Sequence, residues 1–121
     1  MATLSKVKLS ESSLGKQVKV VQAVTPGTLI HSTLTSATVT DEVWIYAVNS
    51  SASSVKLTIE WGAATVPDGN IEVTILPEAG LVTIIPGLIL LGDGSAATTV
   101  KAFAGTANVI MLSGYVNRIT P

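Results

Sequence analysis

The single histidine of this chain, His31, is the one side chain that would act as a general base near neutral pH. A serine–histidine–aspartate triad would combine it with a serine and with Asp41, Asp68 or Asp93. No Gly-x-Ser-x-Gly elbow or other family signature accompanies these residues. We therefore expect His31 to lie on a strand surface or at an interface, and we expect no catalytic residue and no enzymatic activity.

Two acids, Glu60 and Glu72, are expected on the polar faces of strands, where they could approach each other across a strand pair. Paired carboxylates can hydrolyse glycosidic bonds. No deep site lined by aromatic rings is expected around this pair, so solvated strand faces are the preferred interpretation. Asp68 and Asp93 each precede a glycine, which is typical of turns.

Metal and cofactor sites are not expected. The chain has no cysteine and one histidine, so the usual sets of ligands for transition metals cannot be assembled from it. The segments "DGN" and "DGS" lack the other ligands of a calcium loop. "GDGS" lacks the Gly-Lys-Ser/Thr end of a phosphate-binding loop.

The charge of the chain is low. Charged residues make up 12% of it, roughly half the usual share, and the net charge is -1. Nucleic acid is therefore not an expected partner. The apolar run at residues 80–92 is shorter than a membrane span and contains Pro86, so no membrane contact is expected. Four basic residues concentrate at the N-terminus, where they fit either an arm on an acidic protein surface or a solvated tail: Lys6, Lys8, Lys16 and Lys19.

Short segments rich in valine, isoleucine and threonine alternate with turn-forming clusters along the whole chain. Eight to ten strands are expected within residues 4–9, 16–24, 28–34, 42–49, 54–61, 70–76, 81–85, 87–91, 97–104 and 107–117. The pattern predicts an all-β fold: a single small antiparallel β-sandwich or barrel, jelly-roll-like, with an extended N-terminal arm. Residues 1–25 are expected to form this arm or an edge strand, and residues 26–121 the sandwich.

The stretch "DEVWIYAVNSSASSVKLTIEWG", residues 41–62, is interpreted as a hairpin of strands 42–49 and 54–61. A second hairpin is expected at 97–104 and 107–117, across a turn at Gly105-Thr106. The strand at 43–48 is apolar on both faces. Its second face must be covered by an arm or loops of the same chain, or by another subunit.

Aromatic residues make up 4% of the chain and are the natural anchors of an interface. The candidate interface residues are Trp44, Tyr46, Trp61 and Tyr115. The alternative is that they fill one internal core.

Residues 28–119 carry a resemblance to a known class of proteins. The stretch that begins "DEVWIYAVNSS" and runs through "LTIEWG" to the "IIPG" corner, with the closing "ANVIMLSGYVNRI", resembles small virion structural proteins of tailed bacteriophages, especially marine and cyanobacterial phages. The resemblance implies a capsid decoration or cement protein on the outer surface of the head. It implies a homotrimer that binds the major capsid protein and clamps neighbouring capsomers. The residues that carry the resemblance contain no catalytic motif, and the resemblance does not cover the first 25 residues.

Two other interpretations stay open. The protein could be a neck, tail or fibre component of the virion. It could also be a carbohydrate- or receptor-binding β-module, whose platform would need exposed coplanar aromatic rings.

Overall fold

The structure is a computed structural model and describes residues 2–121 of the 121-residue chain, which contain nine strands and no helix. The strands are β1 (Thr3–Lys8), β2 (Val18–Lys19), β3 (Thr28–Ser32), β4 (Thr40–Asn49), β5 (Val55–Trp61), β6 (Asn70–Ile75), β7 (Val82–Leu90), β8 (Thr99–Ala104) and β9 (Ile110–Thr120). The predicted all-β fold class is confirmed.

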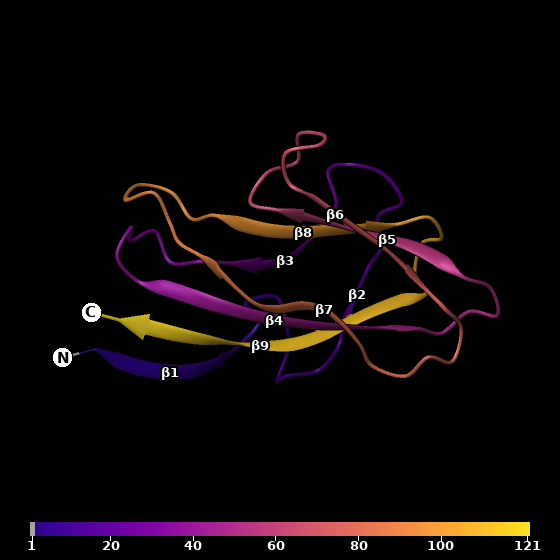
Figure 1. Cartoon of the computed structure of the whole chain (residues 1–121), viewed down its shortest axis with the longest axis horizontal. Coiled ribbons are helices and arrows are strands. Elements are labelled where there is room, and N and C mark those ends of the chain that lie inside the picture. Colours follow the sequence, from indigo (N-terminus) through magenta and orange to yellow (C-terminus); the bar gives the residue numbers. More distant parts are fainter. Residues whose placement is uncertain (1) are drawn as a thin grey trace.

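The strands form two antiparallel sheets that lie face to face (Figure 1). Sheet A has the order β1-β9-β4-β7, with β2 also paired to β9, and sheet B has the order β3-β8-β5-β6. From β2 onward every connection passes from one sheet to the other, except the β5–β6 hairpin. With β1 and β2 sharing one position beside β9, this is the strand order of a jelly-roll sandwich.

The core between the sheets is aliphatic. Alternate residues of β4 point inward and are fully buried, and the facing strand β5 contributes its own alternate set. Among the largest fully buried side chains are Ile45, Leu57, Ile59, Ile85 and Leu112. The chain has two tryptophans, two tyrosines and one phenylalanine, and none of them belongs to the buried core. Aromatic rings usually contribute strongly to cores, so the placement of Trp44, Tyr46 and Tyr115 outside this core is a feature that needs a reason.

The predicted hairpin of strands 42–49 and 54–61 is wrong, because β4 and β5 lie in different sheets. Asn49 explains the change of sheet. Its side-chain nitrogen donates to the carbonyls of Ser53 and Ile75, and its side-chain oxygen accepts from the Ser51 amide. These bonds fold residues 49–53 into a loop that carries the chain across the edge of the core instead of a tight hairpin turn.

The predicted hairpin across Gly105-Thr106 is wrong for a similar reason. The amide of Gly105 bonds to the carbonyl of Lys56 on β5, and the amide of Ala104 bonds to the carbonyl of Gln22. These contacts end β8 in sheet B, and the chain then crosses to sheet A as β9. There β9 pairs with β4 over ten residues, from Thr40 opposite Ile119 to Asn49 opposite Ile110. The long pairing with β4 replaces a local pairing with β8.

The two segments predicted at 81–85 and 87–91 form one strand, β7, which bends around Pro86 and Gly87. The register of β7 against β4 shifts twice near this point. As expected for a residue that cannot donate to a ladder, Pro86 lies on an edge strand of its sheet.

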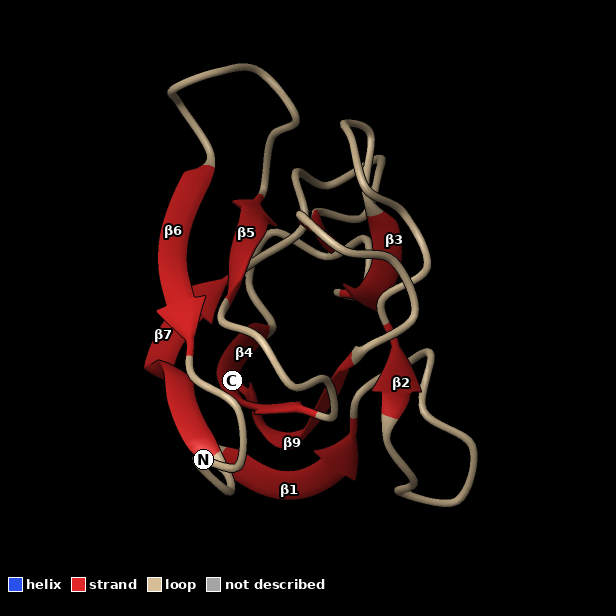
Figure 2. Cartoon of the chain, turned by 90° about the vertical axis from the view of Figure 1, so that its right-hand side faces the viewer, coloured by secondary structure: helices blue, strands red, loops and turns tan. Residues whose placement is uncertain are grey.

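The N-terminal segment closes one side of the sandwich. β1 is an edge strand of sheet A, paired with the C-terminal half of β9, so the two ends of the chain lie together. Beyond β1, the Glu11 amide bonds to the carbonyl of Ile30 on β3, and β2 then returns to β9. Figure 2 shows β2 at the open side between the sheets. Leu9 and Val20 are fully buried, so this segment contributes to the core.

Candidate interaction surface

Sheet A turns its outer face to solvent with three of the four candidate interface residues on it. β4 alternates strictly: Val43, Ile45 and Ala47 are buried, while Trp44 and Tyr46 are half-buried on the outside. The register places Tyr115 of β9 directly opposite Trp44, so both rings lie on the same face. We call Trp44, Tyr46 and Tyr115 the aromatic face.

The rings of Trp44 and Tyr115 are nearly parallel, with centroids 6.1 Å apart and an interplanar angle of 12°. The indole nitrogen of Trp44 donates to Oε1 of Glu42 at 2.7 Å, and the side-chain amide of Asn117 donates to the same oxygen at 3.0 Å. These two bonds hold the pKa of Glu42 below its usual value. Lys6 lies over the Tyr115 ring, with Nζ 4.5 Å from its centroid. The orientation of the aromatic face is therefore fixed by its polar neighbours.

Tyr46 completes the aromatic face beside Tyr115. Burial against its neighbours raises the pKa of Tyr46, and the proximity of Tyr115 raises it further. The Tyr46 phenol is therefore neutral at physiological pH, and it adds the apolar surface of its ring with one hydroxyl group at the edge.

Two glycines make room for this arrangement. Gly114 lies on β9 where a Cβ would stand 1.9 Å from the Trp44 carbonyl oxygen, so the close approach of β4 and β9 requires glycine. Gly87 on β7 has φ +81°, and a Cβ there would lie 2.8 Å from Cζ2 of Trp44. The indole thus rests against the bare backbone of β7.

Replacing Gly87 by alanine is expected to displace the Trp44 ring and to shift its fluorescence emission. Gly80→Ala is the matched control, because Gly80 also has positive φ, +72°, but a methyl group added there would have no atom within 4 Å. Both variants carry the backbone penalty, about 1–2 kcal/mol, but only Gly87→Ala meets the ring. Emission spectra that change equally in the two variants would contradict the contact.

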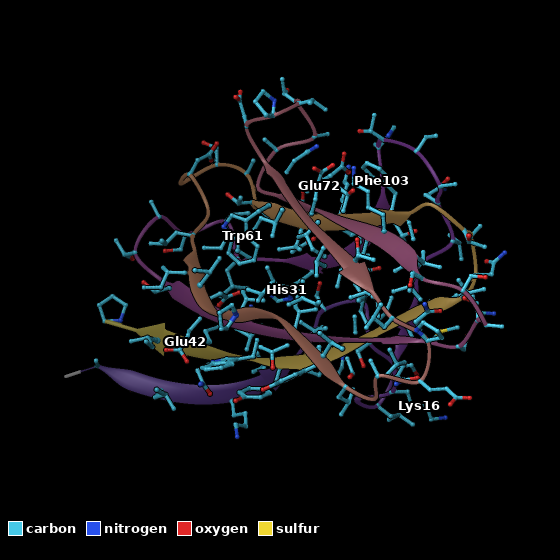
Figure 3. All side chains as sticks on the ribbon, turned by 45° about the vertical axis from the view of Figure 1, so that its right-hand side comes forward. Lys16, His31, Glu42, Trp61, Glu72 and Phe103 are labelled. Atoms are coloured by element: carbon cyan, nitrogen blue, oxygen red, sulfur yellow. The ribbon has the colours of Figure 1, made fainter. Side chains whose placement is uncertain are left out.

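Trp61 does not join the aromatic face. It ends β5 in sheet B on the inward side, in line with Val55, Leu57 and Ile59, and packs against the core. Figure 3 shows Trp61 in the upper layer and Glu42, the neighbour of Trp44, in the lower one. The role of Trp61 at an interface stays a prediction.

The outer face of sheet B is different in character. Lys56 and Glu72 form an exposed ion pair of 2.7 Å. Glu60 is 2% exposed, because the turn before β3 covers it: its carboxylate accepts from the Gly27 amide at 2.7 Å and from the Thr25 hydroxyl. The two glutamates considered as a pair from the sequence thus each have their own partner, and Glu60 is not a solvated residue.

His31 is fully buried between the sheets, so its expected position on a strand surface or at an interface is wrong. Its Nδ1 accepts from the Ser10 amide at 3.0 Å and its Nε2 lies 2.8 Å from Oδ2 of Asp41. Because Nδ1 is an acceptor, the neutral ring carries its proton on Nε2 and donates it to Asp41. Both ring nitrogens are therefore engaged in holding the fold.

Asp41 lies at the centre of this buried network. Arg118, its cross-strand partner on β9, donates from Nε to Oδ1 at 2.8 Å and from Nη2 to Oδ2 at 3.0 Å. Burial alone would raise the pKa of Asp41, but the bonds from Arg118 and His31 outweigh it and leave this pKa lowered. Sequence reasoning paired His31 with Asp41 among three aspartates but missed Arg118, which shares the inward parity of Val116 and Leu112 on β9.

Folding stability is expected to fall as the pH drops below about 6.5, the ordinary value for histidine. Burial lowers the pKa of His31 despite its bond to Asp41. The unfolded chain therefore binds a proton at a higher pH than the folded one, and acidification favours unfolding by up to about 1.4 kcal/mol per pH unit until the folded-state pKa is reached. Asp41, with its pKa lowered from 3.8, adds a second loss at still lower pH.

Urea unfolding measured from pH 7.5 to pH 5 would test this dependence. Since His31 is the only histidine, a His31→Gln variant should lose the slope near pH 6 whatever its absolute stability. A wild-type free energy of unfolding that stays constant between pH 6.5 and 5 would contradict it.

Residues 2–121 form no pocket, and no group of three or more histidine, cysteine or acidic side chains among them is placed to hold a metal ion. The part of the chain that the structure describes has no helix able to cross a membrane. No protein-family model, curated protein or solved structure matches the chain. The aromatic face and the buried His31–Asp41–Arg118 network are thus the most distinctive side-chain arrangements of the described residues.

Proposed function

We propose that this protein is a capsid decoration or cement protein on the outer surface of the expanded head of a tailed bacteriophage. In this role it binds the major capsid protein as a homotrimer and bridges neighbouring capsomers. The sequence resemblance is one support for the proposal. The jelly-roll sandwich is another, since this architecture recurs in viral capsid proteins, although a fold alone does not define a function.

The observation that carries the proposal is the aromatic face. Half-exposed Trp44, Tyr46 and Tyr115 stand on the outside of a domain whose core is built from aliphatic residues. Tryptophan and tyrosine are enriched at the energetic centres of protein interfaces. The N-terminal segment closes the side of the sandwich, and only its Lys6 side chain lies over this face, at Tyr115. A partner is the natural cover for it.

The mechanism is stabilisation by linkage. A protein that binds the assembled lattice, and not the separated subunits, stabilises the lattice by its binding free energy. A trimer that engages several capsomers at once also gains effective concentration for each further contact.

The test is to add the purified protein to expanded heads that lack it and to sediment the mixture. We expect saturable binding in proportion to the number of capsomers, and a trimeric mass by light scattering before addition. Binding of a few copies at one vertex would favour a neck, tail or fibre component instead. A monomeric mass together with no binding to heads would refute the proposal.

One observation favours a second candidate, a carbohydrate- or receptor-binding module. The near-parallel rings of Trp44 and Tyr115, 6.1 Å apart, lie beside polar Glu42 and Asn117, and jelly rolls also occur in lectins. This function predicts quenching of Trp44 fluorescence by glycans in the wild-type protein and its loss in Trp44→Phe. Unchanged fluorescence over a glycan panel would eliminate it.

A further inference from the structure

The outer face of sheet A carries a row of lysines beside the aromatic face. Lys6 and Lys8 of β1 lie opposite Asn117 and Tyr115, and Lys19 of β2 lies opposite Met111, all along the same edge of β9. All three lysines are exposed. Their partners on β9 run from Met111 to Asn117, a distance of six residue steps or about 20 Å. We call Lys6, Lys8 and Lys19 the lysine row.

The lysine row gives this side of the molecule a charge opposite to that of the rest. The N-terminal segment and the aromatic face carry four lysines, including Lys16, against Glu11 and Glu42, a local charge of +2 in a chain whose net charge is -1. On sheet B, by contrast, Lys56 is paired with Glu72. Neither Lys8 nor Lys19 takes part in any of the ion pairs found within residues 2–121.

Two exposed apolar side chains lie beyond one end of the aromatic face, on the same side of the sheet. Ile89 of β7, which lies opposite Glu42, is 58% exposed, and Leu4 of β1, opposite Ile119, is 65% exposed. A partner that covers this face would therefore bury aromatic and aliphatic surface and would meet positive charge along one edge.

We propose that the outer face of sheet A is the docking surface of this protein and that its partner is an acidic protein surface on the capsid lattice. The inference rests on the proposed function and names the partner chemistry of that function. The aromatic face supplies apolar contact area at the centre, and the lysine row supplies complementary charge at one edge. Complementary charge of this kind steers association and sets orientation.

A second copy of this chain, placed face to face across a two-fold axis, is a less suitable occupant, and the contacts of the proposed homotrimer are heterologous and need not use this face. In a two-fold contact the same patch is present on both subunits, so the contact would enclose two lysine rows and no acidic patch. An acidic lattice surface has no such penalty.

The experiment compares two charge reversals that change the net charge equally. Lys6→Glu/Lys8→Glu alters the lysine row, and Lys56→Glu/Lys101→Glu alters sheet B. Trp44→Ser tests the aromatic face. Each variant is first checked for a cooperative thermal transition, and its affinity for expanded heads is then measured by sedimentation over a range of sodium chloride concentrations.

We expect the lysine-row variant to bind heads at least about tenfold more weakly than the wild type and to lose most of its salt dependence. Trp44→Ser is expected to remain folded and to bind about thirtyfold more weakly, as for a residue at the centre of an interface. The sheet B variant is expected to bind like the wild type.

Three results would overturn the inference. If the wild type binds heads but the lysine-row and Trp44 variants bind equally well, the proposed function stands and the docking surface is elsewhere. If these variants dissociate a trimer and leave the affinity per subunit unchanged, the face is covered by a second copy. If the wild type does not bind heads at all, the proposed function fails with the inference.

Discussion

Replacing Asp41 by alanine is expected to cost about 3 kcal/mol or more of folding stability. The carboxylate is 1% exposed and accepts from Nε and Nη2 of Arg118 and from Nε2 of His31. Without it, an imidazole N–H and part of a guanidinium remain buried between the sheets with no acceptor, and that penalty outweighs the lost attraction. Urea unfolding at pH 7.5 measures the change.

Glu72→Ala is the control for this prediction, since it also removes one carboxylate from an ion pair of similar length. The Lys56–Glu72 pair is more than half solvent-exposed at Lys56 and 50% exposed at Glu72, so its loss should change stability by less than about 1 kcal/mol. An Asp41→Ala variant as stable as Glu72→Ala would show that the buried network does not hold the sheets together.

Deleting residues 2–20 is expected to abolish the cooperative unfolding transition. The deletion removes Leu9 and Val20, both fully buried, and the Ser10 amide that His31 accepts from. Loss of one large buried aliphatic side chain costs about 2–5 kcal/mol, and the whole stability of a small domain is about 5–15 kcal/mol. Edge strand β1 and strand β2 are lost with them, which uncovers one side of the sandwich.

A shorter deletion provides the comparison. Residues 2–5 are all exposed and lie at the outer end of β1, so their removal should leave a folded protein with a slightly lower melting temperature. If the longer deletion also melts cooperatively, with native near-ultraviolet circular dichroism, the segment is a separable arm and not a part of the sandwich.

Local sequence patterns were sufficient to predict the strands but not their partners. The alternation of Val43, Ile45 and Ala47 with Trp44 and Tyr46 correctly defined two faces of β4. Nothing within residues 41–62 shows that β4 pairs with β9, more than sixty residues later, because register between distant strands depends on the closed sandwich. The hairpin interpretations therefore failed where a sandwich crossover and a hairpin turn have similar compositions.

The same limit explains what was missed at the candidate surface. Trp44 and Tyr115 meet only because β4 and β9 are neighbours, and Lys6 reaches Tyr115 only because β1 lies beside β9. Trp61, by contrast, has the parity of the inward residues of β5, and that parity was readable from the sequence. His31 lies in a segment without clear alternation, where β3 is irregular between Leu29 and His31, so its burial had no periodic signal.

Imaging of expanded heads with this protein bound, by cryo-electron microscopy, tests the central claim most directly. We predict density for the β-sandwich on the outer surface at the junctions between capsomers, with Trp44 and the lysine row facing the lattice. Density confined to the neck or tail, or a sandwich that contacts the lattice through sheet B, would contradict it.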